Sequence, residues 1–417
     1  MPKRAKNERL NADVCIVGAG PVGGTLACRL ALAGIRTVVV DRAALPPMEH
    51  PDFDGRAYAI AAGSRRLLEE AGVWDTLPEP ACPILEIRVS DGRVGRPASP
   101  LFLHFDHNEL GADAGPFGWM LEARALRVAL NAYMHTLPDL TVLAPAVAEV
   151  ERYDDGATVT ITGGPESGTV IDCQLVVAAE GRQSPLRRAA GIPVTHLPYH
   201  QTGIVCAISH EKPHHCTALE HFLPAGPFAQ LPMSPSPDAE AGGAPNVSAI
   251  VWTERTAVAA QMMALTDEAF ARDIARRLGD HLGALRTVGR RWSYPLSAML
   301  VQRYVDTRLA LAGDAAHGIH PIAGQGLNLG FRDAIALADL LIEAAKDGRD
   351  LGAPMLLERY QRRTRPANVA MLAATDALDR LFSSDNPVLR LARDLGIAAV
   401  HRTPMLKRMF MRQAMGL

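Results

Sequence analysis

The sequence predicts a mixed α/β protein with a Rossmann-like dinucleotide-binding domain, a second β-rich domain and helices at the C-terminal end. Three observations support this fold class. An apolar strand, a glycine turn, a helix and a second apolar strand follow one another between Ala12 and Asp41. Short β-rich runs occupy residues 186–290, and helical patterning extends from Met355 onward. A chain of 417 residues with 48% apolar content can bury more than one core.

The composition argues against several classes of function. Lys and Arg number 43 and Asp and Glu 45, a formal net charge of −2, so we expect no basic face for nucleic acid. The six cysteines form no C-x-x-C pair, which disfavours a disulfide framework or a zinc ribbon. No apolar run reaches the roughly 20 residues of a transmembrane helix. The sequence therefore predicts a cytoplasmic protein.

The first glycine turn has the spacing G-x-G-x-x-G at Gly18, Gly20 and Gly23, between an expected strand and an expected helix. The first glycine permits the tight turn, the second lets the backbone approach a pyrophosphate, and the third lets helix and strand pack closely. Asp41, at the end of the next strand, can accept hydrogen bonds from a ribose. This predicts an adenine dinucleotide site, although the motif alone does not separate FAD from NAD.

The second glycine turn favours a flavin. The segment RLALAGDAAH (308–317) delivers Asp314 to the carboxyl end of a short strand, where ligands bind in open α/β sheets. Gly324 and Gly326 follow, and they allow the backbone to approach a flat ring. A helix that begins near Gly326 would direct its positive N-terminal end at the part of a flavin that gains charge on reduction. His317 flanks this turn, where we expect structural hydrogen bonding.

These segments resemble the flavoprotein aromatic hydroxylases (group A monooxygenases) and, among them, the ubiquinone-biosynthesis hydroxylases. The resemblance runs from Asp13 to about Gly416 and includes DVCIVGAGPVGG, DGRAYAIAAGSRRLL, VVAAEGRQSPLR, PFAQLPM, GDAAHGIHPIAGQGLNLGFRD and LKRMFMRQAMG. It implies noncovalent FAD, NAD(P)H as a transient reductant, O2, and hydroxylation of a polyprenylated phenol. It also implies FAD contacts at Gly18, Gly20, Gly23, Asp41, Arg56, Asp314, Pro321, Gly326, Leu327 and Asn328. Their neighbours Pro21, Val22, Arg42, Gly313, Gly324 and Gln325 are further expected contacts.

The sequence departs from the family pattern at two places. Glu180-Gly181 stands where relatives carry Asp-Gly, so the acid is one methylene longer and its reach toward the cofactor changes. Ala123 stands where relatives usually carry Asn, which leaves Arg124 as the expected flavin neighbour there.

By this resemblance we assign residues 1–85, 115–190 and 285–365 to an FAD-binding domain. Residues 86–114 and 191–284 would form the β-rich substrate domain, and 366–417 a C-terminal helical region. The segment SPSPDAEAGGAPN (234–246) is expected to be a mobile loop.

Residues expected to line the substrate side are Phe228, Gln230, Leu231, Pro232 and Trp252; ordinary core packing is the alternative for the apolar ones. No catalytic base is identified. Arg56 is expected over the cofactor, with a helix-surface arginine as the alternative.

Two further features have simple interpretations. His214, His215, Cys216 and His221 are interpreted as loop or surface residues, because adjacent histidines on a strand point to opposite faces and suit a metal poorly. No metal is expected. The tail, with Met405, Leu406, Met409 and Phe410 beside basic residues, predicts a short amphipathic helix. Such a helix would pack on its own domain, contact a membrane peripherally, or dock to other ubiquinone-biosynthesis enzymes.

Two alternatives to a polyprenylphenol hydroxylase stay open. One is the same chemistry on another aromatic substrate, and the other is a non-catalytic flavin-binding component of a biosynthetic complex. A flavin halogenase is disfavoured because the four tryptophans form no W-x-W-x-I motif.

Overall fold

The computed structural model describes residues 8–45, 56–95, 102–111, 114–235, 246–320, 322–382 and 403–416. Pro321 and most of the expected loop at 234–246 lie outside the described residues.

The half of the molecule that carries the predicted nucleotide site, called the nucleotide-binding half below, is built on a six-stranded sheet. Its strand order is β19-β20-β13-β2-β3-β9. All neighbours are parallel except β19, which runs antiparallel to β20. The central strands VCIV, TVVV and LVVA are buried along nearly their whole length, as expected for a parallel sheet covered on both faces. This confirms the predicted βαβ unit. The strands are β2 (Val14–Val17), β3 (Thr37–Val40), β9 (Leu140–Leu143), β13 (Leu175–Ala178), β19 (Val305–Asp306) and β20 (Leu309–Leu311).

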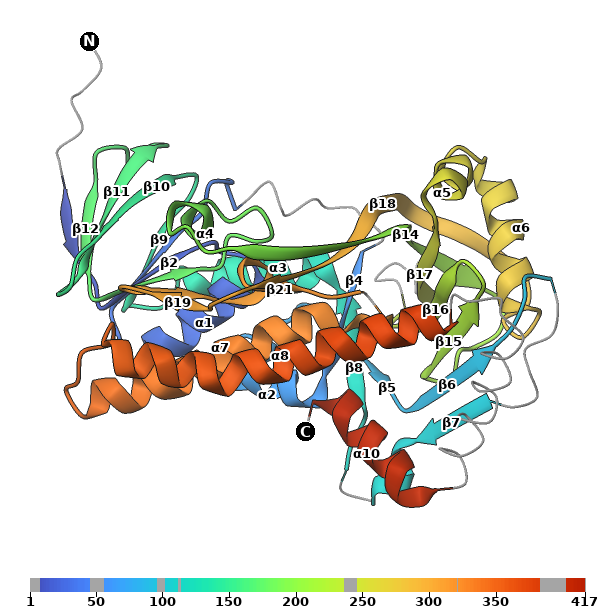
Figure 1. Cartoon of the computed structure of the whole chain (residues 1–417). Helices are drawn as coiled ribbons and strands as arrows, with labels where there is room; N and C mark the ends of the chain where they lie inside the picture. Colours follow the sequence, from blue (N-terminus) through green and yellow to red (C-terminus); the bar gives the residue numbers. More distant parts are fainter. Residues whose placement is uncertain are drawn as a thin grey trace, which may run out of the picture.

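Helices pack against this sheet and against one another. Helix α1 contacts both α3 and α7, and α7 contacts the long helix α8, which runs beside it (Figure 1). Helix α7 carries an apolar face that is buried along most of its length. The bounds are α1 (Pro21–Leu32), α2 (Ala62–Glu70), α3 (Ala123–Met134), α4 (Pro185–Ala189), α7 (Gln325–Lys346) and α8 (Pro354–Phe382).

The β-rich half is an eight-stranded sheet with the order β21-β18-β14-β17-β16-β15-β6-β7. Strands β14 and β18 are 17 residues each and run from this half into the nucleotide-binding half (Figure 1). The predicted boundary at residue 285 coincides with the first residue of β18, which pairs with β14 and β21 within this sheet. The strands are β6 (Glu86–Asp91), β7 (Phe102–Asp106), β14 (Val194–His210), β15 (Thr217–Leu223), β16 (Gly226–Met233), β17 (Val247–Arg255), β18 (Leu285–Val301) and β21 (His317–Gly318).

The remaining described strands form two smaller sheets. A four-stranded sheet contains β1 (Arg9–Asn11), β12 (Val170–Cys173), β11 (Ala157–Gly163) and β10 (Val147–Arg152). A three-stranded sheet contains β4 (Ala57–Ala61), β8 (Gly118–Glu122) and β5 (Cys82–Ile84).

The two faces of the eight-stranded sheet have different neighbours. One face packs against α5 (Thr256–Met263) and α6 (Asp267–Leu278) around a core that contains Phe228, Trp252 and Phe270. The alternate residues of β15, β16 and β17 face a cavity instead, as the two-residue period of a strand requires.

The C-terminal helix α10 (Pro404–Met415) lies near β7 and β5 (Figure 1). Met411 and Met415 are buried in the core between these elements. Lys407 forms an ion pair of 2.6 Å with Glu109, which follows β7. Among the described helices, none combines the length and the apolar character that crossing a bilayer requires.

Candidate functional site

The first glycine turn has the geometry that its three glycines predict. Gly18 has a φ of +111°, and a Cβ there would lie 2.4 Å from the carbonyl oxygen of Ala179. A Cβ on Gly23 would lie 2.0 Å from the carbonyl oxygen of Gly18. Gly20, in contrast, faces open space, with nothing within 4 Å of its missing Cβ. The first and third glycines therefore serve packing, and the second leaves room for a phosphate group at the start of α1.

Asp41 holds this turn in place. One carboxylate oxygen accepts the backbone N–H of Ala19 at 2.7 Å, and the other accepts the N–H of Ala43 at 2.8 Å. Each carboxylate oxygen has two acceptor positions, so a ribose hydroxyl can still bind. Arg42 is exposed beside it.

The two glycine turns, almost 300 residues apart in the chain, lie against each other. The side chain of Val22 is 3.3 Å from the Cβ position of Gly313 and 2.6 Å from that of Gly330. Any side chain at Gly330 would separate α7 from α1. The structure thus brings together the two segments from which we predicted one cofactor site.

Asp333, which was not predicted from the sequence, stabilises the second glycine turn through hydrogen bonds. Its buried carboxylate accepts the N–H of Gly313 at 3.0 Å and an N–H of Asn368 at 2.9 Å, and it lies 2.6 Å from Nε2 of His317. Burial lowers the pKa of His317, but the adjacent carboxylate outweighs this effect, so the pKa is raised overall. His317 is therefore a structural partner, as expected.

At the edge of this turn, Asp314 is half exposed and lies 3.5 Å from Nε of Arg182. Arg182 in turn donates to the carbonyl oxygen of Ser297 at 3.1 Å. Asp314 is therefore accessible to a ligand and oriented by a cation.

Glu180 has a local structural role at the start of α4. Its Oε1 accepts the hydroxyl of Ser184 at 2.8 Å and the N–H of Leu186 at 3.0 Å, so it caps the short helix α4. Burial raises the pKa of Glu180. Its Oε2 is buried and has no hydrogen-bond partner among the described residues. Gly181 follows with a φ of +86°.

The N-terminus of α7 forms the other wall. Gly324 precedes the helix with a φ of +62°, and the missing Cβ of Gly326 faces open space. The side chain of Asn328 is fully engaged: it accepts the N–H of Ala61 and donates to the carbonyl oxygens of Ala59 and Gly324. Asn328 thus fixes α7 to β4, and the polar contacts left for a ligand are backbone groups at Gln325, Gly326 and Leu327, with Asn328 available for van der Waals contact alone.

The two arginines that we expected to contact FAD, Arg56 and Arg124, have partners in different parts of the protein. The guanidinium of Arg56 stacks 4.6 Å from the ring centroid of Trp292 on β18. Arg124 lies 3.7 Å from the carboxylate of Glu122 at the start of α3.

Next to the second turn is a cavity of about 470 Å³. It reaches from Ala59 and Gly324 to α10, where Phe410 is 45% exposed. Among the described residues that line it, only Glu220 carries a charge, and only Thr253 has another polar side chain. The remaining lining residues are Ile84, Ile87, Val89, Leu103, Phe105, Phe117, Ala218, Leu219, Phe222, Pro227, Ala229, Leu231, Val251, Ile322, Leu378, Leu381, Phe382, Met411 and Ala414.

Of the five residues expected on the substrate side, Leu231 lines this cavity. Phe228 and Trp252 instead pack on the opposite face of the sheet, and Gln230 donates to Ser248 at 2.9 Å. Pro232 is buried and alternates with the cavity-facing Leu231. For Phe228 and Trp252, this position is the core packing that we gave as the alternative to substrate contact.

Glu220 is the residue of this cavity that the sequence analysis missed. It is 9% exposed, and burial raises its pKa to about 7. The signal in the sequence was the alternation Ala218, Glu220, Phe222 in TALEHFL, which places a carboxylate on the apolar face of the strand.

The histidine and cysteine segment differs in part from its interpretation as surface. His221 is buried and lies 2.8 Å from the hydroxyl of Ser90. Potential ligand atoms of Cys82, His214 and Cys216 lie within 4.8 Å of one another. Both ring nitrogens of His214 are engaged, one with the N–H of Cys216 and one with the carbonyl oxygen of Met233. Burial raises the pKa of Cys82 to about 12, so its thiol stays protonated at neutral pH.

A nucleotide cradle made from two glycine turns, beside an apolar cavity, defines a dinucleotide-binding oxidoreductase. The chain belongs to the FAD binding domain family, which matches residues 11–375. It is 49% identical over 406 residues to a ubiquinone hydroxylase, UbiL, of Rhodospirillum rubrum, covering 97% of this chain and 90% of that protein. It is 32% identical to the 3-demethoxyubiquinol 3-hydroxylase of Escherichia coli, covering 97% and 98%.

Solved structures share the fold. The p-nitrophenol 4-monooxygenase PnpA of Pseudomonas putida superposes with a TM-score of 0.76 at 18% identity, covering 98% of both chains. The anhydrotetracycline hydroxylase OxyS of Streptomyces rimosus superposes with a TM-score of 0.70 at 25% identity, covering 98% of this chain and 76% of that one.

Proposed function

We propose that this chain is an FAD-dependent monooxygenase that uses O2 and NAD(P)H to hydroxylate the aromatic ring of a polyprenylated phenol in ubiquinone biosynthesis. The observation that carries the proposal is the apolar cavity, which begins at the Gly324 turn and extends to α10. A ring at one end and an apolar chain along the rest fit its lining. The naming of the 49% identical relative as a ubiquinone hydroxylase supports the same substrate class.

The residues present fit FAD. The open space at Gly20 and Gly326 leaves room for cofactor atoms against the backbone, and two helix N-termini offer free N–H donors. Asp41 would hold the ribose and Asp314 the ribityl chain. When bound, the flavin supplies the transfer of electrons from NAD(P)H to O2 and the transfer of one oxygen atom to the ring. The further contacts we propose are Gly18, Pro21, Val22, Gly23, Arg42, Arg56, Arg124, Glu180, Gly181, Gly313, Pro321, Gly324, Gln325, Leu327 and Asn328.

The chain itself positions the ring and excludes water. The sequence carries a single G-x-G-x-x-G fingerprint, so NAD(P)H would dock transiently rather than in a second nucleotide fold. The cavity wall formed by β15, β16 and β17 is apolar, and it shields the reaction from hydrolytic side reactions.

We also propose that α10 touches a membrane surface peripherally, with other ubiquinone-biosynthesis enzymes as the alternative partner. Met405, Met409 and Phe410 are 86%, 57% and 45% exposed, and Arg408 and Arg412 belong to the same helix. Because Phe410 also lines the cavity, a prenyl chain could pass between the bilayer and the cavity at this point.

The direct experiment follows NAD(P)H oxidation and product formation by FAD-loaded enzyme under isotope-labelled O2. With a polyprenylated phenol, we expect a product that contains one labelled oxygen. An enzyme for small phenols would show no preference for the polyprenylated phenol over the same phenol without its prenyl chain. A non-catalytic flavoprotein would form no product with either of these two substrates.

A further inference from the structure

Glu220 is a carboxylic acid in a cavity whose remaining walls are almost entirely apolar. It lies on β15, opposite Ala229 on β16, and both side chains face the cavity. It is 9% exposed. Because side chains alternate along a strand, Glu220 points to the same side of β15 as Ala218 and Phe222, which also line the cavity.

The carboxylate of Glu220 has no hydrogen bond or ion pair with any described residue. Burial of an ionised carboxylate is unfavourable unless a partner compensates for lost water. The other buried acid of the site, Asp333, has three such partners. A buried acid without a partner, directed into a cavity, indicates that a ligand supplies the missing donor.

We propose that Glu220 binds the ring hydroxyl of the phenolic substrate and accepts its proton, so that the ring is hydroxylated as a phenolate. This inference rests on the proposed function and identifies the base for it. In the step, the O–H bond of the substrate breaks and its electron pair stays on the phenolate oxygen. The proton moves to a carboxylate oxygen of Glu220, and it returns to the product hydroxyl before release. The proton transfer itself consumes no oxidant or reductant.

Deprotonation serves the chemistry because a phenolate donates more electron density to its ring carbons than a phenol does. The apolar surroundings help in a second way. Burial raises the pKa of Glu220 to about 7, which brings it closer to the value of about 10 for a phenol hydroxyl. A base whose pKa lies near the working pH is more effective in proton transfer.

Thr253 offers a second polar contact to the same ring. Its hydroxyl oxygen is buried, lines the cavity and has no hydrogen-bond partner among the described residues. It lies on β17, two strands from β15, about 10 Å away across the sheet. The residue of β17 that is level with Glu220 is Val251, so Thr253 is displaced by about a further 7 Å along the strand. The pair therefore suits a substrate whose second polar substituent lies away from the hydroxyl that Glu220 binds.

Glu220 is the one charged side chain among the described residues that line the cavity, and the lining residues of β16, β17, α8 and α10 carry no charge. On β6, Val89 lies opposite Glu220, and the buried Asp91 follows on the same face, where it accepts the N–H of Gly92 at 3.0 Å. The neighbouring His221 is directed to Ser90. Loss of the pH dependence in Glu220→Gln therefore distinguishes Glu220 from Asp91.

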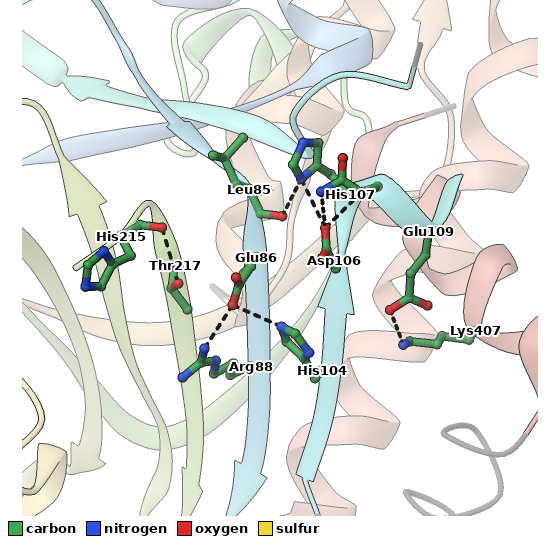
Figure 2. A network of polar contacts seen from close by, with 11 residues as sticks. Leu85, Glu86, Arg88, His104, Asp106, His107, Glu109, His215, Thr217 and Lys407 are labelled. Carbon is green, nitrogen blue, oxygen red and sulfur yellow. Dashed lines mark hydrogen bonds and ion pairs between the residues drawn. The ribbon is translucent and has the colours of Figure 1, made fainter. Parts of the chain in front are cut away.

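The test compares Glu220→Gln with Glu86→Gln in the FAD-loaded enzyme. Glu86 lies on the adjacent strand β6 and contacts Arg88 and His104 (Figure 2). It is not among the described residues that line the cavity. For the wild type we expect kcat to rise with pH through about 7. For Glu220→Gln we expect a kcat about 100-fold lower without that rise, with unchanged FAD absorbance and unchanged flavin reduction by NAD(P)H. Glu86→Gln should behave like the wild type.

A binding measurement keeps the proposal testable even if Glu220→Gln folds poorly. A polyprenylated phenol is added to the oxidised wild-type enzyme without reductant, and its dissociation constant is measured between pH 5 and pH 9. We expect binding to tighten as Glu220 ionises near pH 7, because the carboxylate then accepts the phenol hydroxyl, and we expect no such tightening in Glu220→Gln. If the wild type hydroxylates the phenol and Glu220→Gln matches its kcat and pH profile, Glu220 is not the base and the proposed function stands. If the wild type hydroxylates no polyprenylated phenol, the proposed function itself fails.

Discussion

The side chain of Val22 lies 2.6 Å from the Cβ position of Gly330, so the first turn of α1 and the first turns of α7 meet without space for another atom. The FAD cradle that we propose depends on this contact, because one turn belongs to each helix.

We expect Gly330→Ala to weaken FAD binding about tenfold and to lower the free energy of unfolding by about 1–3 kcal/mol, because the added methyl group forces the helices apart. FAD titration and urea denaturation measure the two effects. Val22→Ala removes the opposing methyl groups, so the double variant Val22→Ala with Gly330→Ala should recover much of both losses. No recovery in the double variant would show that the contact is not the cause.

The buried pair of Asp333 and His317 should make stability depend on pH. The pKa of His317 in the folded protein is raised above its ordinary value of 6.5. The resulting stabilisation is fully present below pH 6.5 and is lost as the pH rises through the folded value. We expect Asp333→Asn to remove this dependence and to cost about 3 kcal/mol at pH 6, since it breaks a buried pair.

Asp339→Asn is the matched control for that prediction. Asp339 lies on the same helix but is partly exposed, and it pairs with Arg29 and Arg363. Urea denaturation between pH 5 and pH 9 distinguishes the two variants. The same pH profile in both would contradict the role of the buried pair.

The exposed methionines of α10 provide the test of membrane contact. We expect the combined Met405→Ser and Met409→Ser variant to lose several-fold in binding to anionic vesicles by flotation, while hydroxylation of a short-chain phenol is retained. Removing the chain after Val400 should abolish flotation as well. Met355→Ser is the control, because Met355 is 84% exposed at the start of α8. Equal flotation of all forms would exclude the membrane role of α10.

Glu220 should reduce stability, in keeping with its proposed role in binding. Its folded pKa of about 7 exceeds its ordinary value of 4.5, so its charged form is disfavoured in the folded state. The penalty is absent below pH 4.5, grows between pH 4.5 and 7 and is complete above pH 7. We therefore expect Glu220→Gln to raise the free energy of unfolding at pH 8 by at most about 3 kcal/mol, and to have little effect at pH 4.5. Equal stability of the two proteins at both pH values would mean that the acid is compensated by a group we have not identified.

Local patterns in the sequence predicted the nucleotide-binding strands, the helices that follow them and both glycine turns. This succeeded because each of these elements depends on residues close in the chain: the continuous apolar runs of VCIV, TVVV and LVVA, and the glycines whose positions α1 and α7 require. The amphipathic pattern of the C-terminal tail was equally local, and α10 confirms it.

Features that depend on tertiary contacts were not predicted. The face of β16 and β17 that meets the cavity is decided by where α5 and α6 pack, so the strand pattern alone left both substrate contact and core packing open for Phe228 and Trp252. The partners of Asp333 come from two separate segments, one with Gly313 and His317 and one with Asn368, and only the fold brings them together. The pairing of β18 with β14, some 90 residues earlier in the chain, is likewise a tertiary contact that no local pattern indicates.

The most direct test of the account is the flavin content of the purified protein. The two glycine turns should hold one FAD per chain, visible as the yellow absorbance of oxidised flavin, and NAD(P)H should bleach it in the absence of oxygen. A colourless protein that takes up no FAD at micromolar concentrations would contradict the site and every function built on it.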